Sequence, residues 1–223
     1  MGRGMRGEIL EGIGRCGIVP VIRLESAEQA RGLGRALVAG GLLVAEVTFR
    51  SAAASGAIAL LRKEYPELLV GAGTVLSVVQ VEAALAAGAS FAVTPGFNPR
   101  VVDACLASGL PVVPGINSPS QVEMALELGL DLLKFFPAEA SGGVKMLASL
   151  HGPYPEISFV PTGGIDSSNL ASYLTLPYVA AVGGSWMVRE ELIASGSWSE
   201  IERLSDEAVS LAEAARGRGR VSN

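Results

Sequence analysis

Two ionisable residues interrupt otherwise apolar segments of this 223-residue chain: Lys134 in the run DLLKFF and Glu46 in the run VAEVTF. Burying an unpaired charge is costly, so such residues need a partner or a function. A desolvated lysine amine attacks a ketone to form an imine, and a facing carboxylate carries the protons that this chemistry moves. We therefore expect a retro-aldol site on Lys134 and Glu46, with a purely structural ion pair as the alternative.

The segments around these residues alternate short β-branched runs with longer amphipathic runs rich in Ala and Leu, which is typical of βα units around a parallel sheet. Eight short runs are expected as strands, over residues 17–22, 43–49, 68–71, 90–94, 110–113, 131–136, 157–160 and 178–183. Helices are expected at 26–39, 77–87, 118–128, 167–174 and 189–215. With about 28 residues per unit, this pattern predicts an α/β fold with a single (β/α)8 TIM barrel. We expect one domain over residues 1–215 and a disordered tail over 216–223.

Side chains of a strand alternate between its two faces. Glu46, Thr48 and Arg50 therefore share one face of the second run, and the apolar residues between them share the other. The same alternation places Lys134 and Phe136 together on the sixth run. Alternate strands of a barrel fill the same interior layer, so we expect Lys134 and Glu46 to meet inside the barrel.

Most of the predicted strands end in clusters of glycine, proline or threonine. Thr162-Gly163-Gly164 follows the seventh run and Gly183-Gly184-Ser185 follows the eighth, where barrel enzymes commonly bind phosphate through backbone N–H groups. Ordinary loop glycines are the alternative. Arg50, after the second run, is a candidate clamp for a carboxylate, and Arg23, after the first run, is another.

Composition excludes several classes of function. A formal charge of −5 argues against nucleic acid or an anionic membrane as a partner, and no apolar stretch approaches the length of a membrane span. Hydrophobic residues make up 49% of the chain and charged residues 17%, which leaves little charge to cover a free surface and predicts an oligomer.

The cysteines and the single histidine indicate neither metal nor redox chemistry. Cys16 and Cys105 are far apart and suit a reducing cytoplasm. The single histidine, His151, is expected at an exposed helix end, which excludes a histidine metal centre or a Ser-His-Asp triad. We expect neither a metal nor a cofactor.

Eight motifs together resemble the KDPG/KHG aldolase family, from about Gly17 to Trp186, in order and with the expected spacing. They are EVTFR (46–50), GAGTV (71–75), TPG (94–96), PGI (114–116), KFFPAE (134–139), GGVK (142–145), PTGGI (161–165) and GGSW (183–186). The resemblance implies a cytosolic class I aldolase, usually a homotrimer, without metal or cofactor. Its substrate would be 2-dehydro-3-deoxy-6-phosphogluconate (KDPG), which it would split into pyruvate and glyceraldehyde 3-phosphate in the Entner–Doudoroff pathway.

The resemblance also implies a role for each matching residue. Lys134 corresponds to the Schiff-base lysine and Glu46 to the general acid and base, while Lys145 is an exposed helix residue. The implied pyruvyl pocket consists of Arg50, Thr74, Pro95 and Phe136, and the implied phosphate site consists of Gly163, Gly164, Gly184 and Ser185.

Other functions remain open at this point. The galactonate analogue of the substrate is one, although Arg50 favours the gluconate series because related galactonate-series aldolases often lack this arginine. 4-Hydroxy-2-oxoglutarate is a further candidate substrate, because its pyruvyl half is the same. A phosphosugar isomerase or epimerase would use the same phosphate site without an imine, and a catalytically silent protein would only bind a phosphosugar.

Overall fold

Parallel strands and helices alternate along the chain, which is described here by a computed structural model. The structure describes residues 3–220, and it describes the side chains of residues 7–217. The strands are β1 (Ile18–Ile22), β2 (Val44–Thr48), β3 (Leu69–Gly73), β4 (Phe91–Val93), β5 (Val112–Val113), β6 (Gly115–Ile116), β7 (Leu132–Phe135), β8 (Ser158–Pro161) and β9 (Val182–Gly184). The helices are α1 (Arg3–Cys16), α2 (Gln29–Ala39), α3 (Ala54–Glu64), α4 (Val78–Ala86), α5 (Pro99–Ala107), α6 (Pro119–Glu127), α7 (Gly143–His151), α8 (Leu170–Leu174), α9 (Glu190–Ala194), α10 (Trp198–Arg220) and the 3-10 helix η1 (Trp186–Val188).

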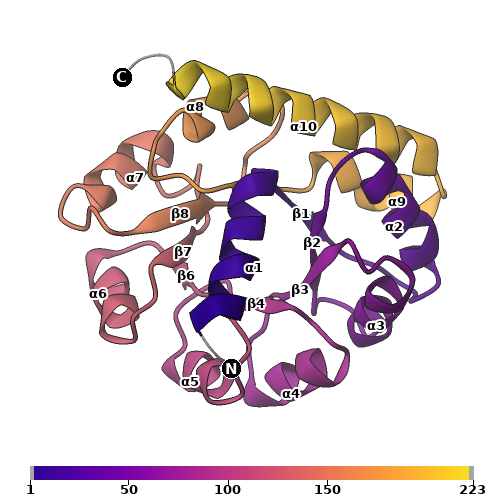
Figure 1. Cartoon of the computed structure of the whole chain (residues 1–223), viewed down its shortest axis with the longest axis horizontal. Helices are drawn as coiled ribbons and strands as arrows, with labels where there is room; N and C mark the ends of the chain where they lie inside the picture. The colour runs from indigo at the N-terminus through magenta and orange to yellow at the C-terminus, as the bar shows by residue number, and fades with distance from the viewer. Residues whose placement is uncertain (1–2, 221–223) are drawn as a thin grey trace.

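The strands pair in parallel within two sheets, in the orders β5-β4-β3-β2-β1-β9 and β6-β7-β8. Only Pro114 separates β5 from β6, and two isolated bridges, Phe159 with Val179 and Thr162 with Gly183, link β8 to the segment of β9. The strands curl around the centre of the molecule, and the helices other than α1 lie outside them (Figure 1). These pairings confirm an α/β fold with a curled parallel sheet.

Each predicted strand run overlaps an observed strand, and the fifth prediction needs one correction. Run 110–113 becomes β5, and the chain forms a second short strand, β6, directly after Pro114. Proline has no backbone N–H to donate to a ladder, which interrupts the strand at this residue. The carbonyl of Pro114 still accepts a hydrogen bond of 2.9 Å from the backbone N–H of Lys134, so β6 leads into the pairing with β7.

The inside of the curled sheet has its own apolar core, separate from the core between the sheet and the outer helices. Its buried members are Ile13, Val19, Val44, Phe91, Val93, Val113, Leu132, Val160 and Ala181. Gly71 leaves room for the Phe91 ring, since a Cβ at Gly71 would lie 2.3 Å from that ring. Ile13 comes from α1, which crosses the centre of the ring in Figure 1. This packing closes one end of the sheet and leaves the carboxyl ends of the strands for chemistry.

The C-terminal prediction needs correction. The predicted helical region 189–215 divides into α9 and α10 near Gly196, whose φ of +66° is left-handed. Residues 216–220, predicted to be disordered, continue α10. The guanidinium of Arg216 donates hydrogen bonds to the carbonyls of Arg15 and Ala180, contacts that no local sequence pattern reveals and that anchor the helix to the start of the sheet. Residues 221–223 of the predicted tail lie outside the described residues.

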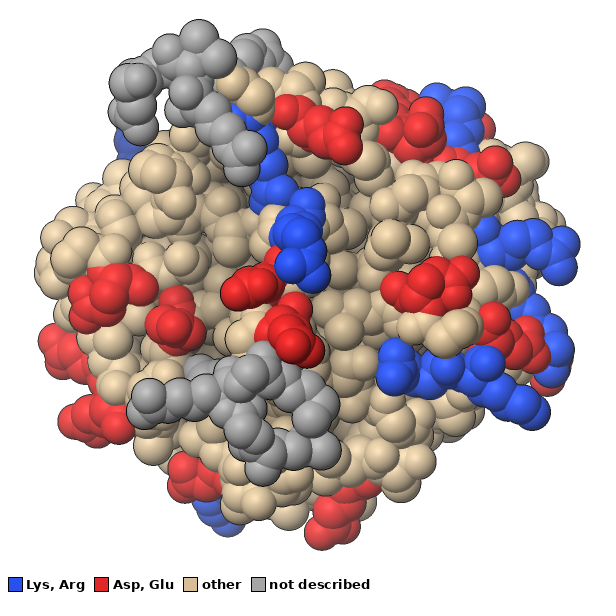
Figure 2. All heavy atoms as spheres, in the orientation of Figure 1, with Lys and Arg blue, Asp and Glu red and all other residues tan. Residues whose placement is uncertain are grey.

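The surface carries both signs of charge. Figure 2 shows acidic and basic side chains interspersed on the face that carries α1, with wide uncharged areas between them. Along residues 3–220, none of the helices combines the length and the apolar character needed to cross a membrane.

Candidate active site

Lys134 on β7 and Glu46 on β2 form a buried pair. The Lys134 Nζ atom lies 3.1 Å from Glu46 Oε1 and 3.3 Å from Glu46 Oε2. Only 7% of the lysine side chain and 3% of the glutamate side chain are exposed. The structure thus brings together the two groups that strand alternation places inside the sheet, although they are 88 residues apart in the chain.

Glycine on the neighbouring strand leaves the space that the Glu46 side chain occupies. Glu46 pairs in register with Gly71 of β3, and a Cβ built on Gly73, two residues further along β3, would lie 2.4 Å from Glu46 Oε1. Real Cβ contacts are not this short, so a side chain at residue 73 would have to displace the carboxylate. The glycines of the GAGT cluster (71–74) therefore leave space for the Glu46 carboxylate as well as allowing the chain to turn.

Gly73→Ala is expected to lower kcat by about 10- to 100-fold, because a carboxylate displaced by about 1 Å no longer faces the amine correctly. The fold is expected to remain, since Gly73 has no left-handed φ that alanine would strain. Steady-state kinetics and thermal unfolding of the purified variant test both statements. Activity at the wild-type level would show that the carboxylate tolerates this displacement. Gly14→Ala is the control for introducing a methyl group, because Gly14 has no left-handed φ and no heavy atom lies within 4 Å of the added Cβ.

The surroundings of the amine are suited to covalent chemistry. The Lys134 Nζ atom lies 5.6 Å from the centroid of the Phe136 ring, at the carboxyl end of the same strand. The short distance between the buried amine and the Glu46 carboxylate allows a proton to pass between nitrogen and oxygen without entering bulk water.

Arg50 follows β2 on the same face as Glu46. Its Nε atom donates a 3.1 Å hydrogen bond to Thr48 Oγ1, and among residues 7–217 no carboxylate forms an ion pair with it. Arg23, the other candidate carboxylate clamp, contacts Glu25 at 2.7 Å and Glu190 at 3.0 Å. The structure therefore favours Arg50 as the group that remains available to a ligand carboxylate.

Thr74, Pro95 and Phe136 are half-buried at the carboxyl ends of β3, β4 and β7. Thr74 has a φ of +55°, a left-handed conformation that is strained for a β-branched residue and that clusters at functional sites. The loop that carries Pro95 is held by Thr94, whose Oγ1 atom donates to the Gly96 carbonyl and accepts from the Gly115 N–H. Of the three residues, Phe136 is the one whose ring faces the Lys134 amine.

The two predicted phosphate loops lie side by side, because Thr162 and Gly183 form a parallel bridge. Gly163 and Gly164 have φ values of +102° and +77°, which glycine adopts readily. Within the described part of the chain, no acceptor is found for the backbone N–H groups of Gly163, Gly164 and Ser185. Adjacent open N–H groups of this kind are typical of phosphate sites.

The prediction that His151 is exposed is wrong. Its ring is half-buried and stacks on Tyr178 with a centroid distance of 3.9 Å, so the residue packs as an aromatic side chain.

Cys105 is buried, and burial raises the pKa of its thiol to about 11, which keeps it in the unreactive form. No group of three or more metal-ligating side chains is found among the described residues.

Sequence reasoning missed the residues that position the others, namely Gly73, Thr94 and Thr48. Thr48 is buried, and its Oγ1 atom donates a 2.7 Å hydrogen bond to the Ile22 carbonyl while it accepts from Arg50. The signal in the sequence that could have indicated this role is the position of Thr48 between Glu46 and Arg50 on one face of the strand. Thr94 had no such signal, because its contact with Gly115 joins two strand ends that are 21 residues apart in the chain.

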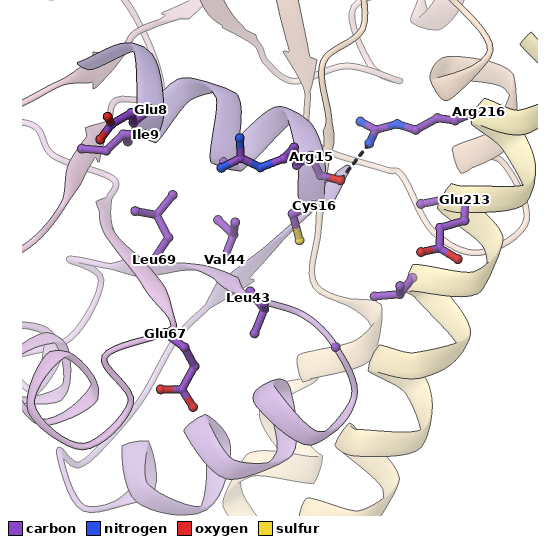
Figure 3. A pocket seen from close by; sticks show the side chains of 14 residues that line it. Glu8, Ile9, Arg15, Cys16, Leu43, Val44, Glu67, Leu69, Glu213 and Arg216 are labelled. Carbon is purple, nitrogen blue, oxygen red and sulfur yellow. Dashed lines mark hydrogen bonds between the residues drawn. The ribbon is translucent and has the colours of Figure 1, made fainter. Parts of the chain in front are cut away.

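A cavity of about 510 Å³ lies elsewhere, between α1, the start of β2 and β3, and α10 (Figure 3). Its lining combines apolar side chains with charged ones and contains none of the predicted site residues: Glu8, Ile9, Gly12, Arg15, Cys16, Gly41, Leu43, Val44, Glu67, Leu69, Val209, Ala212, Glu213 and Arg216. Arg15 and Arg216 meet at its edge, where the Arg216 guanidinium donates to the Arg15 carbonyl. This cavity is therefore separate from the Lys134 site.

Comparison with known proteins gives consistent matches. Residues 9–204 match the family model described as KDPG and KHG aldolase. The chain is 50% identical over 203 residues to the 2-dehydro-3-deoxy-phosphogluconate aldolase of Treponema pallidum, covering 91% of this chain and 97% of that protein. It is 43% identical to the KHG/KDPG aldolase of Escherichia coli, covering 86% of this chain and 90% of that protein.

A solved structure resembles most of this chain. It is the KDPG aldolase of Legionella pneumophila with pyruvate captured at low pH as a covalent carbinolamine intermediate. The two chains superpose with a TM-score of 0.86 and share 43% identity, covering 90% of this chain and 97% of the other.

Proposed function

The chain belongs to the KDPG and KHG aldolase family, and from this premise we infer that it is a Schiff-base (class I) aldolase. It cleaves KDPG to pyruvate and D-glyceraldehyde 3-phosphate. The observation that carries this conclusion is the buried Lys134–Glu46 pair, with 3.1 Å between the reacting nitrogen and the carboxylate. A carbinolamine in the similar Legionella structure is the intermediate that such an amine forms first.

The first half of the reaction builds the imine. The neutral Lys134 amine attacks the C2 ketone, and Glu46 moves protons so that the carbinolamine loses water. The resulting iminium withdraws electrons from the neighbouring carbons. Because the pair is almost completely buried, these proton transfers occur between fixed groups and not through bulk solvent.

The second half breaks the carbon–carbon bond. Glu46 takes the proton from the C4 hydroxyl while the C3–C4 bond breaks and its electron pair moves toward the iminium nitrogen. The aldehyde leaves as glyceraldehyde 3-phosphate. Glu46 then returns its proton to C3 of the enamine, and water hydrolyses the imine to release pyruvate and the amine.

The proposed binding groups lie at the carboxyl ends of the strands. Arg50 would hold the substrate carboxylate through its two terminal nitrogens, and Thr74, Pro95 and Phe136 would line the pyruvyl pocket. Gly163, Gly164, Gly184 and Ser185 would hold the phosphate, a role supported by the adjacent loops and by the open N–H groups of Gly163, Gly164 and Ser185.

The proposal extends to architecture and assembly. We propose that the two sheets form one complete (β/α)8 barrel in a single domain over residues 1–215, supported by the bridges near β8 and by the single-residue break at Pro114. A homotrimer in the cytoplasm is proposed from the family resemblance. Exposed apolar side chains such as Val79 and Leu76, which are 72% and 55% exposed, are consistent with an oligomer.

Among the alternatives, the gluconate series is favoured because the Treponema and Legionella relatives are named as aldolases of phosphogluconate. An isomerase or epimerase has no need of a buried amine at a carboxylate, so this geometry argues against it. The Escherichia coli relative, named KHG/KDPG aldolase, supports 4-hydroxy-2-oxoglutarate as a second substrate, which would give pyruvate and glyoxylate.

The proposed activity is tested by coupling pyruvate release to lactate dehydrogenase with purified enzyme. KDPG is offered beside its galactonate analogue, unphosphorylated 2-dehydro-3-deoxygluconate and 4-hydroxy-2-oxoglutarate. We expect the highest kcat/KM for KDPG. Pyruvate release from none of these substrates would overturn the proposed function.

Gly164→Ala is expected to separate phosphorylated from unphosphorylated substrates. Gly164 has a left-handed φ, and an added Cβ would lie 2.8 Å from Glu139 Cβ, so the loop must move. We expect kcat/KM for KDPG to fall about 10- to 100-fold, the size expected for losing one or two hydrogen bonds to a charged group. The kcat/KM for 4-hydroxy-2-oxoglutarate, which lacks a phosphate, is expected to change by less than about threefold. Equal losses on both substrates would argue against a phosphate site here.

A further inference from the structure

The Thr48 hydroxyl connects the end of β1 to Arg50. The residue is 1% exposed, at the carboxyl end of β2, and lies between Glu46 and Arg50 on the same face of the strand. Its Oγ1 atom lies 2.7 Å from the Ile22 carbonyl oxygen and 3.1 Å from Arg50 Nε. These two contacts form a continuous chain from backbone to hydroxyl to guanidinium.

The direction of each hydrogen bond in this chain is determined by chemistry. A carbonyl oxygen only accepts, so the single Thr48 hydroxyl proton goes to Ile22. A guanidinium nitrogen only donates, so the Thr48 oxygen accepts from Arg50. The hydroxyl therefore has no freedom to rotate without breaking one of its two bonds.

This arrangement restrains an otherwise exposed arginine. The contact with Thr48 uses Nε and leaves the two terminal nitrogens of Arg50 outside this hydrogen bond. No carboxylate among residues 7–217 forms an ion pair with them. A pair of parallel N–H donors matches the two oxygens of a carboxylate, and holding the pair in place before binding reduces the ordering cost of association.

We propose that Thr48 is a positioning residue whose hydroxyl orients the Arg50 guanidinium toward the carboxylate of the pyruvyl half of the substrate. The inference rests on the proposed function, because it assumes that a 2-keto acid binds beside Lys134. Thr48 does not itself touch the substrate. Its effect is therefore on the binding of any ligand that carries this carboxylate, phosphorylated or not.

Reductive trapping of the Lys134 imine with borohydride measures this effect directly. For Thr48→Val, which keeps the shape and loses the hydroxyl, the half-saturating concentration of pyruvate is expected to rise about tenfold. Thr48→Ser, which keeps the hydroxyl, is expected to stay within about twofold of the wild type. Methyl pyruvate, an ester without the anionic carboxylate, is expected to be trapped by Thr48→Val as well as by the wild type.

A double-mutant cycle separates positioning from general stability. In an Arg50→Ala background, Thr48→Val is expected to cause no further rise in the half-saturating pyruvate concentration, because the group that it positions is gone. A further tenfold rise there, an equal loss with methyl pyruvate, or no change in Thr48→Val alone would overturn the inference. Failure of the wild type to trap pyruvate would overturn the proposed function and this inference together. Thermal unfolding monitors the fold, and Thr48→Cys, with its weak donor and acceptor, replaces Thr48→Val if the latter does not fold.

Discussion

Lys134→Ala is expected to reduce the rate of KDPG cleavage by about 10⁴-fold or more, because removing the proposed nucleophile would remove the covalent pathway entirely. The same variant is expected to give no borohydride-trapped adduct with pyruvate. The chain has three lysines, Lys63, Lys134 and Lys145, so peptide mass spectrometry of the trapped wild-type enzyme places the adduct on one of three peptides. The pyruvyl mass on the peptide of Lys134 is the expected result.

Two controls separate lost chemistry from lost structure. Lys134→Ala leaves the buried Glu46 carboxylate without its cation, a change that typically costs about 3–5 kcal/mol of stability. Lys134→Arg keeps a cation in place but forms no imine, and we expect it to be equally inactive. Lys145→Ala, on the exposed side of α7, is expected to retain wild-type activity. Wild-type cleavage by folded Lys134→Ala, or an adduct on Lys145, would contradict the assignment.

Much of the site was predictable because strand alternation is strict. A period of two places Glu46, Thr48 and Arg50 on one face whatever the surrounding loops do, and a lysine within an apolar strand requires either a buried partner or a reaction. The strands themselves were equally accessible, since β-branched runs that end in glycine and proline clusters repeat along the chain. Buried charges in regular elements are thus strong signals, because local pattern and physical cost point to the same residues.

Features that depend on distant contacts could not be predicted in this way. The charged residues Glu8, Glu11 and Arg15 hide the apolar face of α1 in the sequence pattern. The role of that face is evident only in the structure, where Ile13 completes the inner core of the sheet. The continuation of α10 depends on Arg216, whose carbonyl acceptors lie 201 and 36 residues away in the chain. The left-handed φ of Thr74 is also hidden, since threonine rarely adopts this conformation.

Glu46→Gln is expected to lower kcat for KDPG cleavage by about 10²- to 10⁴-fold, the range for losing a general acid and base. The amide has nearly the same shape as the carboxylate, so the space beside Gly73 remains filled. The variant retains the Lys134 amine, the proposed nucleophile. The imine with pyruvate is therefore expected to be trapped by borohydride after long incubation, while each proton transfer that follows is slow.

Exchange of the pyruvate methyl protons with deuterated water isolates these proton transfers, because it requires the imine and the enamine but no carbon–carbon cleavage. NMR is expected to show exchange slowed by about the same factor as cleavage in Glu46→Gln. Glu46→Asp, which withdraws the carboxylate by one methylene from a partner 3.1 Å away, is expected to lie between Glu46→Gln and the wild type. Wild-type exchange in Glu46→Gln would assign the proton transfers to another group. Loss of trapping as well would mean that Glu46 is needed to form the imine, so the two measurements together locate the step at which this carboxylate acts.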